Sequence, residues 1–143
     1  MTPLTGTESD AVERLERFWR STGAVVLNRE PSTHDDHAAW ISHAPHVLAY
    51  AFAHALGEGP LSAGEMAGSG FRDFTRIARS DAALWGDILS ANRKSLARPL
   101  EEFSRSLSEL ARAIEEGDVN KVEQFLASAR DGLTKMESGS GDD

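Results

Sequence analysis

All five histidines of this 143-residue chain fall within 21 consecutive residues: His34, His37, His43, His46 and His54. Imidazoles bind metal ions, transfer protons and hydrogen-bond to anions. Two His-x-x-His pairs beside Asp35 and Asp36 offer nitrogen and oxygen ligands for a metal. No His-Glu-x-x-His motif occurs, however, and the aspartates lie where a helix begins, where carboxylates complement the helix dipole. We therefore expect no metal site.

A pocket for a small carboxylate ligand is the second possibility. Arg76 is able to clamp a carboxylate through two hydrogen bonds, with Asp73 three residues earlier orienting it. Ser42 and His46 are four residues apart, so on a helix they face the same side. The plainer alternative for Asp73 and Arg76 is an exposed ion pair, which stabilises a helix by at most about 0.5 kcal/mol.

Residues 1–30 predict one helix and one strand. The helix runs from about Glu8 to Thr22, capped by Thr7 or Ser9, and ends before Gly23. Ala24–Leu27 predicts a short strand, yet no other segment predicts a strand to pair with it. Either this segment is a loop, or its sheet lies on another polypeptide.

The next helix is expected from about His34 to Leu56, capped by Ser32 or Thr33. Pro45 removes one backbone donor inside it, so we expect a kink between residues 42 and 46. Two stripes share the helix: an apolar one of Ile41, Ala44, Leu48, Phe52 and Ala55, and a polar one of His43, His46, Tyr50 and His54. The first predicts core, and the second a cavity or partner.

The rest of the chain predicts further helices and an all-α fold. A short helix over Leu61–Ala67 precedes one over Phe71–Ser80, and a long helix capped by Asp81 reaches about Glu116, with a kink or break at Pro99. Apolar residues repeat along it as a helix–helix or dimer seam: Leu89, Leu96, Leu100, Phe103, Leu107, Leu110 and Ile114. Asp118 caps a last helix before a disordered tail, residues 137–143. For Trp40 and Trp85 the simple expectation is core packing.

Composition excludes several classes of function. The net charge of −8 disfavours general binding to nucleic acids or anionic membranes, and the absence of cysteine removes disulfides, thiolate nucleophiles and zinc–thiolate sites. Residues 70–98 hold six bases against three acids, which suits a small anionic ligand. We find no membrane span, no signal peptide and no GxGxxG or GxxxxGK[ST] loop, so we expect a cytoplasmic protein that binds no nucleotide by itself.

Several motifs together resemble the prephenate dehydrogenase family. They are His34-Asp35, the run SHAPH at residues 42–46, the run GFRDFTRIA at residues 70–78, Ser80-Asp81, Trp85 and Ala91-Asn92-Arg93. Their order and spacing are similar to the family pattern over most of residues 1–118.

The resemblance implies an enzyme that oxidatively decarboxylates prephenate or arogenate with NAD or NADP, in tyrosine biosynthesis. It implies that Arg76 binds a substrate carboxylate, that Ser42, His43, His46 and Asp73 shape the pocket, and that His34, Asp35 and Trp85 lie near the site or its entrance. It also implies an intertwined homodimer of all-α domains.

The family's glycine loop and catalytic-histidine segment are absent from this sequence, so the chain resembles only the C-terminal half of the enzyme. We expect residues 1–30 to be the end of a nucleotide-binding domain, residues 31–136 the all-α domain, and no hydride transfer by the chain alone. A separate nucleotide-binding polypeptide would then supply the cofactor. The alternatives are a stand-alone dimeric binding or regulatory module, and a cofactor-free enzyme acting on a prephenate-like acid.

Overall fold

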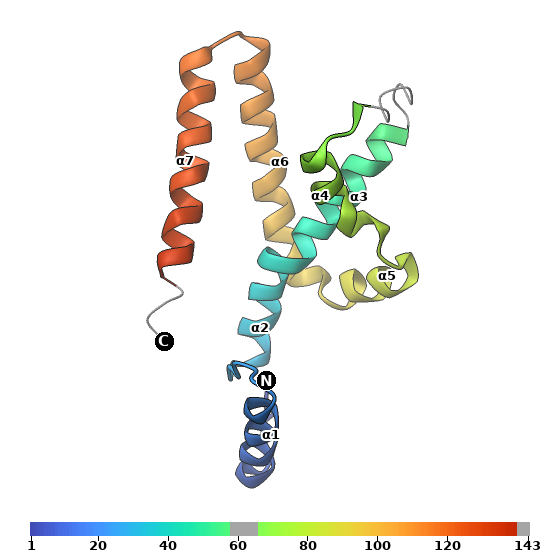
Figure 1. Ribbon diagram of the computed structural model, residues 1–143, viewed down its shortest axis with the longest axis vertical. Helices are drawn as coiled ribbons and strands as arrows, with labels where there is room; N and C mark the ends of the chain where they lie inside the picture. The colour runs from blue at the N-terminus through green and yellow to red at the C-terminus, as the bar shows by residue number, and fades with distance from the viewer. Residues whose placement is uncertain (58–65, 140–143) are drawn as a thin grey trace. The chain divides into compact units, whose positions relative to one another are not determined.

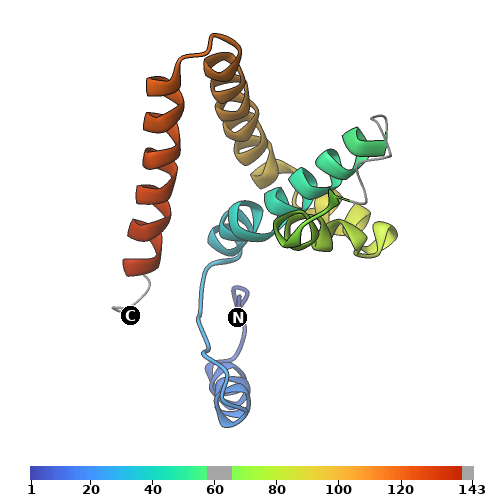
Figure 2. The ribbon, with the colours of Figure 1, turned by 45° about the horizontal axis from the view of Figure 1, so that its top comes forward.

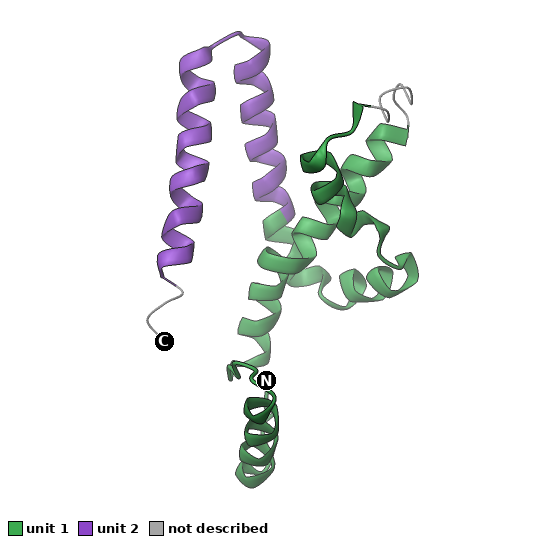
Figure 3. Cartoon of the chain, viewed as in Figure 1, with its two compact units in different colours: residues 1–99 green, residues 100–143 purple. Residues whose placement is uncertain are grey.

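The computed structural model describes residues 1–57 and 66–139, and regular structure in these residues is entirely helical. The all-α prediction is confirmed. The chain divides into two compact units, residues 1–99 and 100–143 (Figure 3). The predicted helix over Leu61–Ala67 lies largely outside the described residues.

The first helix, α1, spans Ser9–Ser21, close to the predicted range (Figure 1). Its N-cap residue is Glu8 and no side chain caps it, so the predicted caps Thr7 and Ser9 are wrong. Gly23 follows the helix with φ of +86°, a conformation that favours glycine, as the predicted helix end requires.

The predicted strand at Ala24–Leu27 is not formed; these residues belong to an extended but irregular segment that follows α1 (Figure 2). The Met1 amino group donates to Leu27 O, and Arg29 N donates to Met1 O at 3.0 Å, so the first residue lies beside Asn28 in a parallel arrangement. Two hydrogen bonds are too few for a ladder, and Val25 is 88% exposed. Within the described residues this segment therefore pairs with residue 1 but belongs to no sheet.

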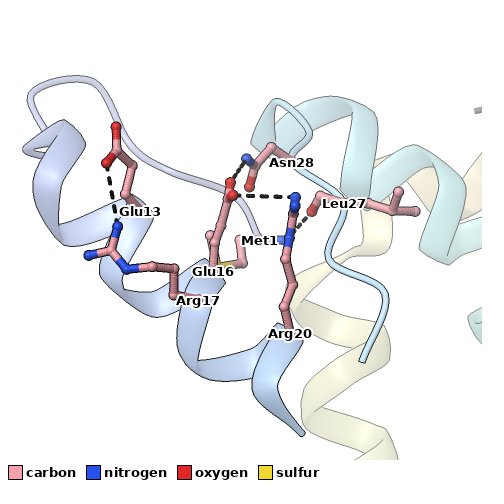
Figure 4. A network of polar contacts seen from close by, with 7 residues as sticks. All are labelled: Met1, Glu13, Glu16, Arg17, Arg20, Leu27 and Asn28. Carbon is pink, nitrogen blue, oxygen red and sulfur yellow. Dashed lines mark hydrogen bonds and ion pairs between the residues drawn. The ribbon is translucent and has the colours of Figure 1, made fainter. Parts of the chain in front are cut away.

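Polar side chains join the extended segment to α1 (Figure 4). Asn28 Nδ2 donates to Glu16, whose carboxylate also pairs with Arg20 at 3.4 Å. Glu13 and Arg17 form a second, exposed pair at 3.7 Å one turn earlier. Glu16 thus fixes the return of the chain against its own helix.

One continuous helical rod follows, made of three parts (Figure 2). These are α2 (Pro31–Ala38), the π-helix η1 (Ala39–His43) and α3 (Ala44–Gly57). Pro31 occupies the first turn, where its missing N–H costs nothing, so the rod begins three residues before the predicted start and without the predicted caps Ser32 or Thr33.

The predicted irregularity at Pro45 takes the form of this π-helix. Ala44 N donates to Ala39 O, five residues back, instead of to the residue four back. Because Pro45 has no N–H, a regular α-helix would leave the Ile41 carbonyl without its donor. The wider turn relaxes the ladder one residue before the proline.

Three short elements pack along the rod: α4 (Ser69–Arg76), the 3-10 turn η3 (Ile77–Arg79) and α5 (Ala82–Ala91). Asp81 caps α5 as predicted, accepting from Leu84 N at 2.8 Å. The long helix predicted from Asp81 breaks at Asn92 and not at Pro99. Pro99 lies inside α6 (Arg93–Glu115) and is fully buried.

The second unit consists of the greater part of α6 and of α7 (Val119–Ser138), which turns back antiparallel to it. Gly117, with φ of +67°, ends α6, and Asp118 caps α7 by accepting from Lys121 N at 3.1 Å. The helix includes residues 137 and 138, so the predicted disordered tail is wrong there; residues 140–143 lie outside the described part.

Much of the apolar surface in each unit is open to solvent. In the part of the chain that the structure describes, the buried apolar side chains are Leu96, Pro99 and four alanines, Ala39, Ala44, Ala49 and Ala113. Of the predicted core stripe, Ile41 is 71% exposed, and Trp40 is also exposed, which corrects both core predictions. Along the predicted seam Leu107 and Ile114 are 54% and 61% exposed. Apolar stripes of this extent are typical of surfaces that a partner covers.

Candidate functional site

The predicted polar stripe of the rod meets Trp85 of α5. The His46 ring stacks on the Trp85 indole, with centroids 3.5 Å apart and planes 17° apart. The His43 ring meets the same indole edge-on at 6.1 Å and 81°. All three side chains are half-buried. Trp85 thus packs against the two histidines, and we call these three residues with Asn92 the histidine cluster.

Asn92 ties the cluster together from the corner between α5 and α6. Its Nδ2 lies 2.7 Å from the backbone oxygen of Asp35 and 3.0 Å from Nδ1 of His43. Its backbone, with φ of −99° and ψ of +22°, leaves the helical region at this corner. One carboxamide therefore connects the corner to both α2 and the π-helix.

The π-helix holds the ring of His46, which lies in the first turn of α3. His46 Nδ1 lies 2.9 Å from the backbone oxygen of Ser42, a carbonyl within the π-helix. This hydrogen bond fixes the His46 ring on the rod, and the same ring stacks on Trp85. Ser42 and His46 were predicted to face the same cavity. In the structure Ser42 contacts His46 through its backbone carbonyl.

A further contact holds the start of α5 against the rod. The Tyr50 hydroxyl donates to Ser80 O at 2.8 Å, across 30 residues of sequence. Ser80 precedes the Asp81 cap, and Trp85 N in turn donates to Asp81 O at 3.1 Å. The position of the indole over the histidines therefore follows from the Tyr50 contact and the cap.

Burial lowers the pKa of His43, because the half-buried ring loses hydration that its charged form needs. The Asp35 carboxylate opposes this effect, while the neighbouring His34 and His46 lower the pKa further. His43 therefore favours its neutral form, in which one nitrogen donates and the other accepts.

The other predicted site residues are exposed. Asp73 and Arg76 lie on α4, and neither takes part in an ion pair within residues 1–57 and 66–139. The expected orienting contact between them is absent there, which leaves the Arg76 guanidinium free of any carboxylate in that part of the chain. His34 Nδ1 and Asp35 Oδ1 lie 3.1 Å apart, also exposed.

No group of three or more potential metal-binding side chains is arranged around a common point in the described residues. A groove of about 870 Å³ lies elsewhere, between α6 and α7. A smaller apolar groove of about 270 Å³ lies between residues 1–4 and α1. Neither groove is lined by the histidine cluster.

Sequence reasoning missed the roles of Asn92 and Tyr50. The signal for Asn92 is a residue with low helix propensity inside a long expected helix, where its carboxamide competes with the backbone. Tyr50 was placed on the polar stripe, but its partner is the backbone oxygen of Ser80. Every residue has such an oxygen, so the sequence does not show which one Tyr50 contacts.

Neither of the phosphate-binding motifs GxGxxG and GxxxxGK[ST] occurs in the 143 residues, so the sequence offers no standard loop for the phosphates of NAD or NADP. No helix in the part of the chain that the structure describes is long and apolar enough to cross a membrane.

Comparison with known proteins places these features in a family. The family pattern described as "Prephenate dehydrogenase, dimerization domain" matches residues 30–128. The chain is 32% identical to prephenate dehydrogenase of Bacillus subtilis, over 97% of this chain and 39% of that protein. It is also 32% identical to cyclohexadienyl dehydrogenase of Zymomonas mobilis, over 91% of this chain and 46% of that one.

A solved structure shares the fold. Prephenate dehydrogenase from Aquifex aeolicus, in complex with hydroxyphenyl propionate and NAD⁺, superposes with a TM-score of 0.80 at 31% sequence identity. The match covers 95% of this chain and 48% of that one, so the chain spans less than half the length of each of these relatives. By its family match over residues 30–128, the chain belongs to the prephenate dehydrogenase dimerization-domain family.

Proposed function

We propose that this chain is the C-terminal substrate-binding and dimerisation part of a prephenate dehydrogenase-like enzyme. That enzyme oxidatively decarboxylates prephenate or arogenate on the way to tyrosine. The observation that carries the proposal is the family match over residues 30–128, because that range contains every residue of the histidine cluster.

The proposed site takes a small carboxylate ligand. Arg76 supplies the guanidinium, whose planar donors suit a carboxylate and which no carboxylate of the described residues engages. His46, His43 and Trp85 provide a half-buried aromatic surface for the rest of the ligand. Ser42 and Asp73 shape the pocket, with His34 and Asp35 at its entrance.

Homodimerisation is the second part of the proposal. The exposed apolar residues of α6 and α7 include Leu107, Ile114, Leu126 and Leu133. Leaving such stripes in water is costly, at roughly 25 cal/mol per Å² of apolar surface. A second copy of the chain would cover them, which agrees with the description of the matched family as a dimerization domain.

A nucleotide-binding part, on the same or another polypeptide, completes the enzyme and holds the hydride acceptor, NAD or NADP. Supporting this, Ala24–Leu27 are extended, and Met1 pairs with residues 27 and 29 in the parallel manner of neighbouring strands. We propose that this segment adds to the edge of that part's sheet, where its free backbone groups find partners.

Calorimetric titration of prephenate into the 143-residue chain tests the proposal, with absorbance followed in parallel without nicotinamide. Binding without consumption is the expected result, and NAD-dependent turnover is expected once a nucleotide-binding domain is supplied as a second chain. Consumption without nicotinamide would point to a cofactor-free enzyme. Binding with no turnover under any pairing would favour a stand-alone binding module, and no binding in either setting would refute the substrate role.

A further inference from the structure

We propose that His43 and His46 are held in opposite neutral tautomers, with Asn92 as the positioning residue for His43. In this arrangement His43 carries its proton on Nε2 and His46 carries its proton on Nδ1. The tautomers follow from the hydrogen bonds alone and do not depend on the proposed function.

The argument starts from Asn92. Its side-chain atom nearest to Asp35 lies 2.7 Å from a carbonyl oxygen, which only accepts. That atom must therefore be the NH₂ nitrogen and not the amide oxygen. The same nitrogen lies 3.0 Å from Nδ1 of His43, and its second hydrogen is available for this contact. Nδ1 of His43 is consequently the acceptor, and the neutral ring carries its proton on Nε2.

The argument for His46 is the same with the roles exchanged. Its Nδ1 lies 2.9 Å from the carbonyl oxygen of Ser42, so Nδ1 carries the hydrogen. In the neutral ring Nε2 is then left with a free lone pair. Two histidines three residues apart, both against Trp85, therefore differ in which nitrogen accepts.

The two rings respond differently to an added proton. A proton on His46 enters at Nε2 and leaves the bond to Ser42 intact. A proton on His43 must enter at Nδ1, where it faces the Asn92 NH₂ group and destroys that hydrogen bond. The charged groups around His43 are Asp35, which favours its protonation, and His34 and His46, which oppose it.

Two-bond ¹H–¹⁵N correlation spectra of the uniformly ¹⁵N-labelled chain, recorded near pH 8, test the tautomers directly. We expect an unprotonated Nδ1 in His43 and an unprotonated Nε2 in His46, with His43→Gln and His46→Gln identifying each ring. The same tautomer in both rings, or a proton on Nδ1 of His43, would overturn the proposal. This measurement needs no ligand, so it is independent of the proposed function.

Variants of Asn92 test its role. Asn92→Ala removes the donor, so we expect His43 to exchange between tautomers while His46 is unchanged. Asn92→Asp replaces the donor by an acceptor, which should move the His43 proton to Nδ1 and raise the pKa of His43. Asn120→Asp on α7 makes the same charge change in the other unit and should leave both rings as they are. If the tautomer of His43 is unaltered in both Asn92 variants, Asn92 is not its positioning residue. If the variants do not fold, the spectrum of the wild-type chain tests the tautomers by itself.

Discussion

The imidazole of His46 and the indole of Trp85 lie face to face, 3.5 Å apart between centroids and 17° from parallel. They come from α3 and α5, which are separate in sequence by a segment that includes all of α4. The stack therefore holds α5 against the helical rod at the level of the cluster. It couples the stability of the first unit to the geometry of the candidate site.

Trp85→Ala should destabilise the first unit. The substitution removes the stack and the edge contact with His43, and leaves a gap beside both rings. For a half-buried tryptophan we expect a loss of about 2 kcal/mol in the free energy of unfolding. Urea unfolding followed by far-UV circular dichroism, at one fixed protein concentration, measures it. Trp40→Ala, at an exposed position on the π-helix, is the matched control and should cost less; equal losses would contradict the role of the stack.

The free energy of unfolding should depend on His43 at mildly acidic pH. The folded-state pKa of His43 is lowered from 6.5, so the unfolded chain binds the proton more tightly. Its contribution is fully present above pH 6.5 and declines as the pH falls below that value, until the lowered pKa is passed. Urea midpoints at pH 8 and pH 5.5 should therefore differ more in the wild-type chain than in His43→Gln. Identical differences in the two chains would show that His43 is not the responsible group.

Arg76→Ala should weaken prephenate binding by about 1.5–3 kcal/mol, because a charge-assisted hydrogen bond to the ligand carboxylate is lost. Folding should be little affected, since Arg76 is exposed. Calorimetry provides the affinities. Arg79→Ala removes an exposed arginine one turn later, in η3, and is the control for the change of charge. An affinity unchanged by Arg76→Ala, or reduced equally by both variants, would exclude a specific clamp.

Leu107→Asp should shift the chain towards the monomer. Leu107 is exposed on α6, in the stripe that we assign to the dimer interface, and a carboxylate there would have to be desolvated. Sedimentation equilibrium of the wild-type chain should give about twice the mass of 15.5 kDa, and the variant should give less. Ser104→Asp adds the same charge at an exposed polar position of α6 and should retain the dimer. A wild-type monomer at all concentrations would refute the proposed self-association.

Helix starts were predictable only where the capping side chain acts within its own turn. Asp81 and Asp118 each accept a hydrogen bond from the backbone N–H three residues ahead. This interaction depends only on the local sequence. The predicted caps before Pro31 failed because proline itself opens the first turn. At Asn92 low helix propensity permits a break but does not require one, since the bonds that hold its side chain go to residues more than 45 positions earlier.

For the candidate site, the sequence located the polar stripe but not its partner contacts. His43, His46 and Trp85 lie together in the structure, and their role in binding a substrate stays a prediction. The expected link between Asp73 and Arg76 is missing in the described residues, because i,i+3 spacing permits a contact without requiring one. Burial was misjudged for Trp40 and Ile41, since periodicity shows which residues share a face but not which molecule covers it.

The π-helix also makes one place in the rod tolerant of a change in length. It accommodates an extra residue per turn between Ala39 and His43, so deletion of a single residue there would restore a regular α-helix and keep the rotation of α2 relative to α3. In regular α-helix each residue turns the chain by about 100°. A deletion at residues 36–38 of α2 would therefore rotate everything before it by that angle, and Asp35 would leave Asn92. One-residue deletions should be better tolerated within the π-helix than in α2.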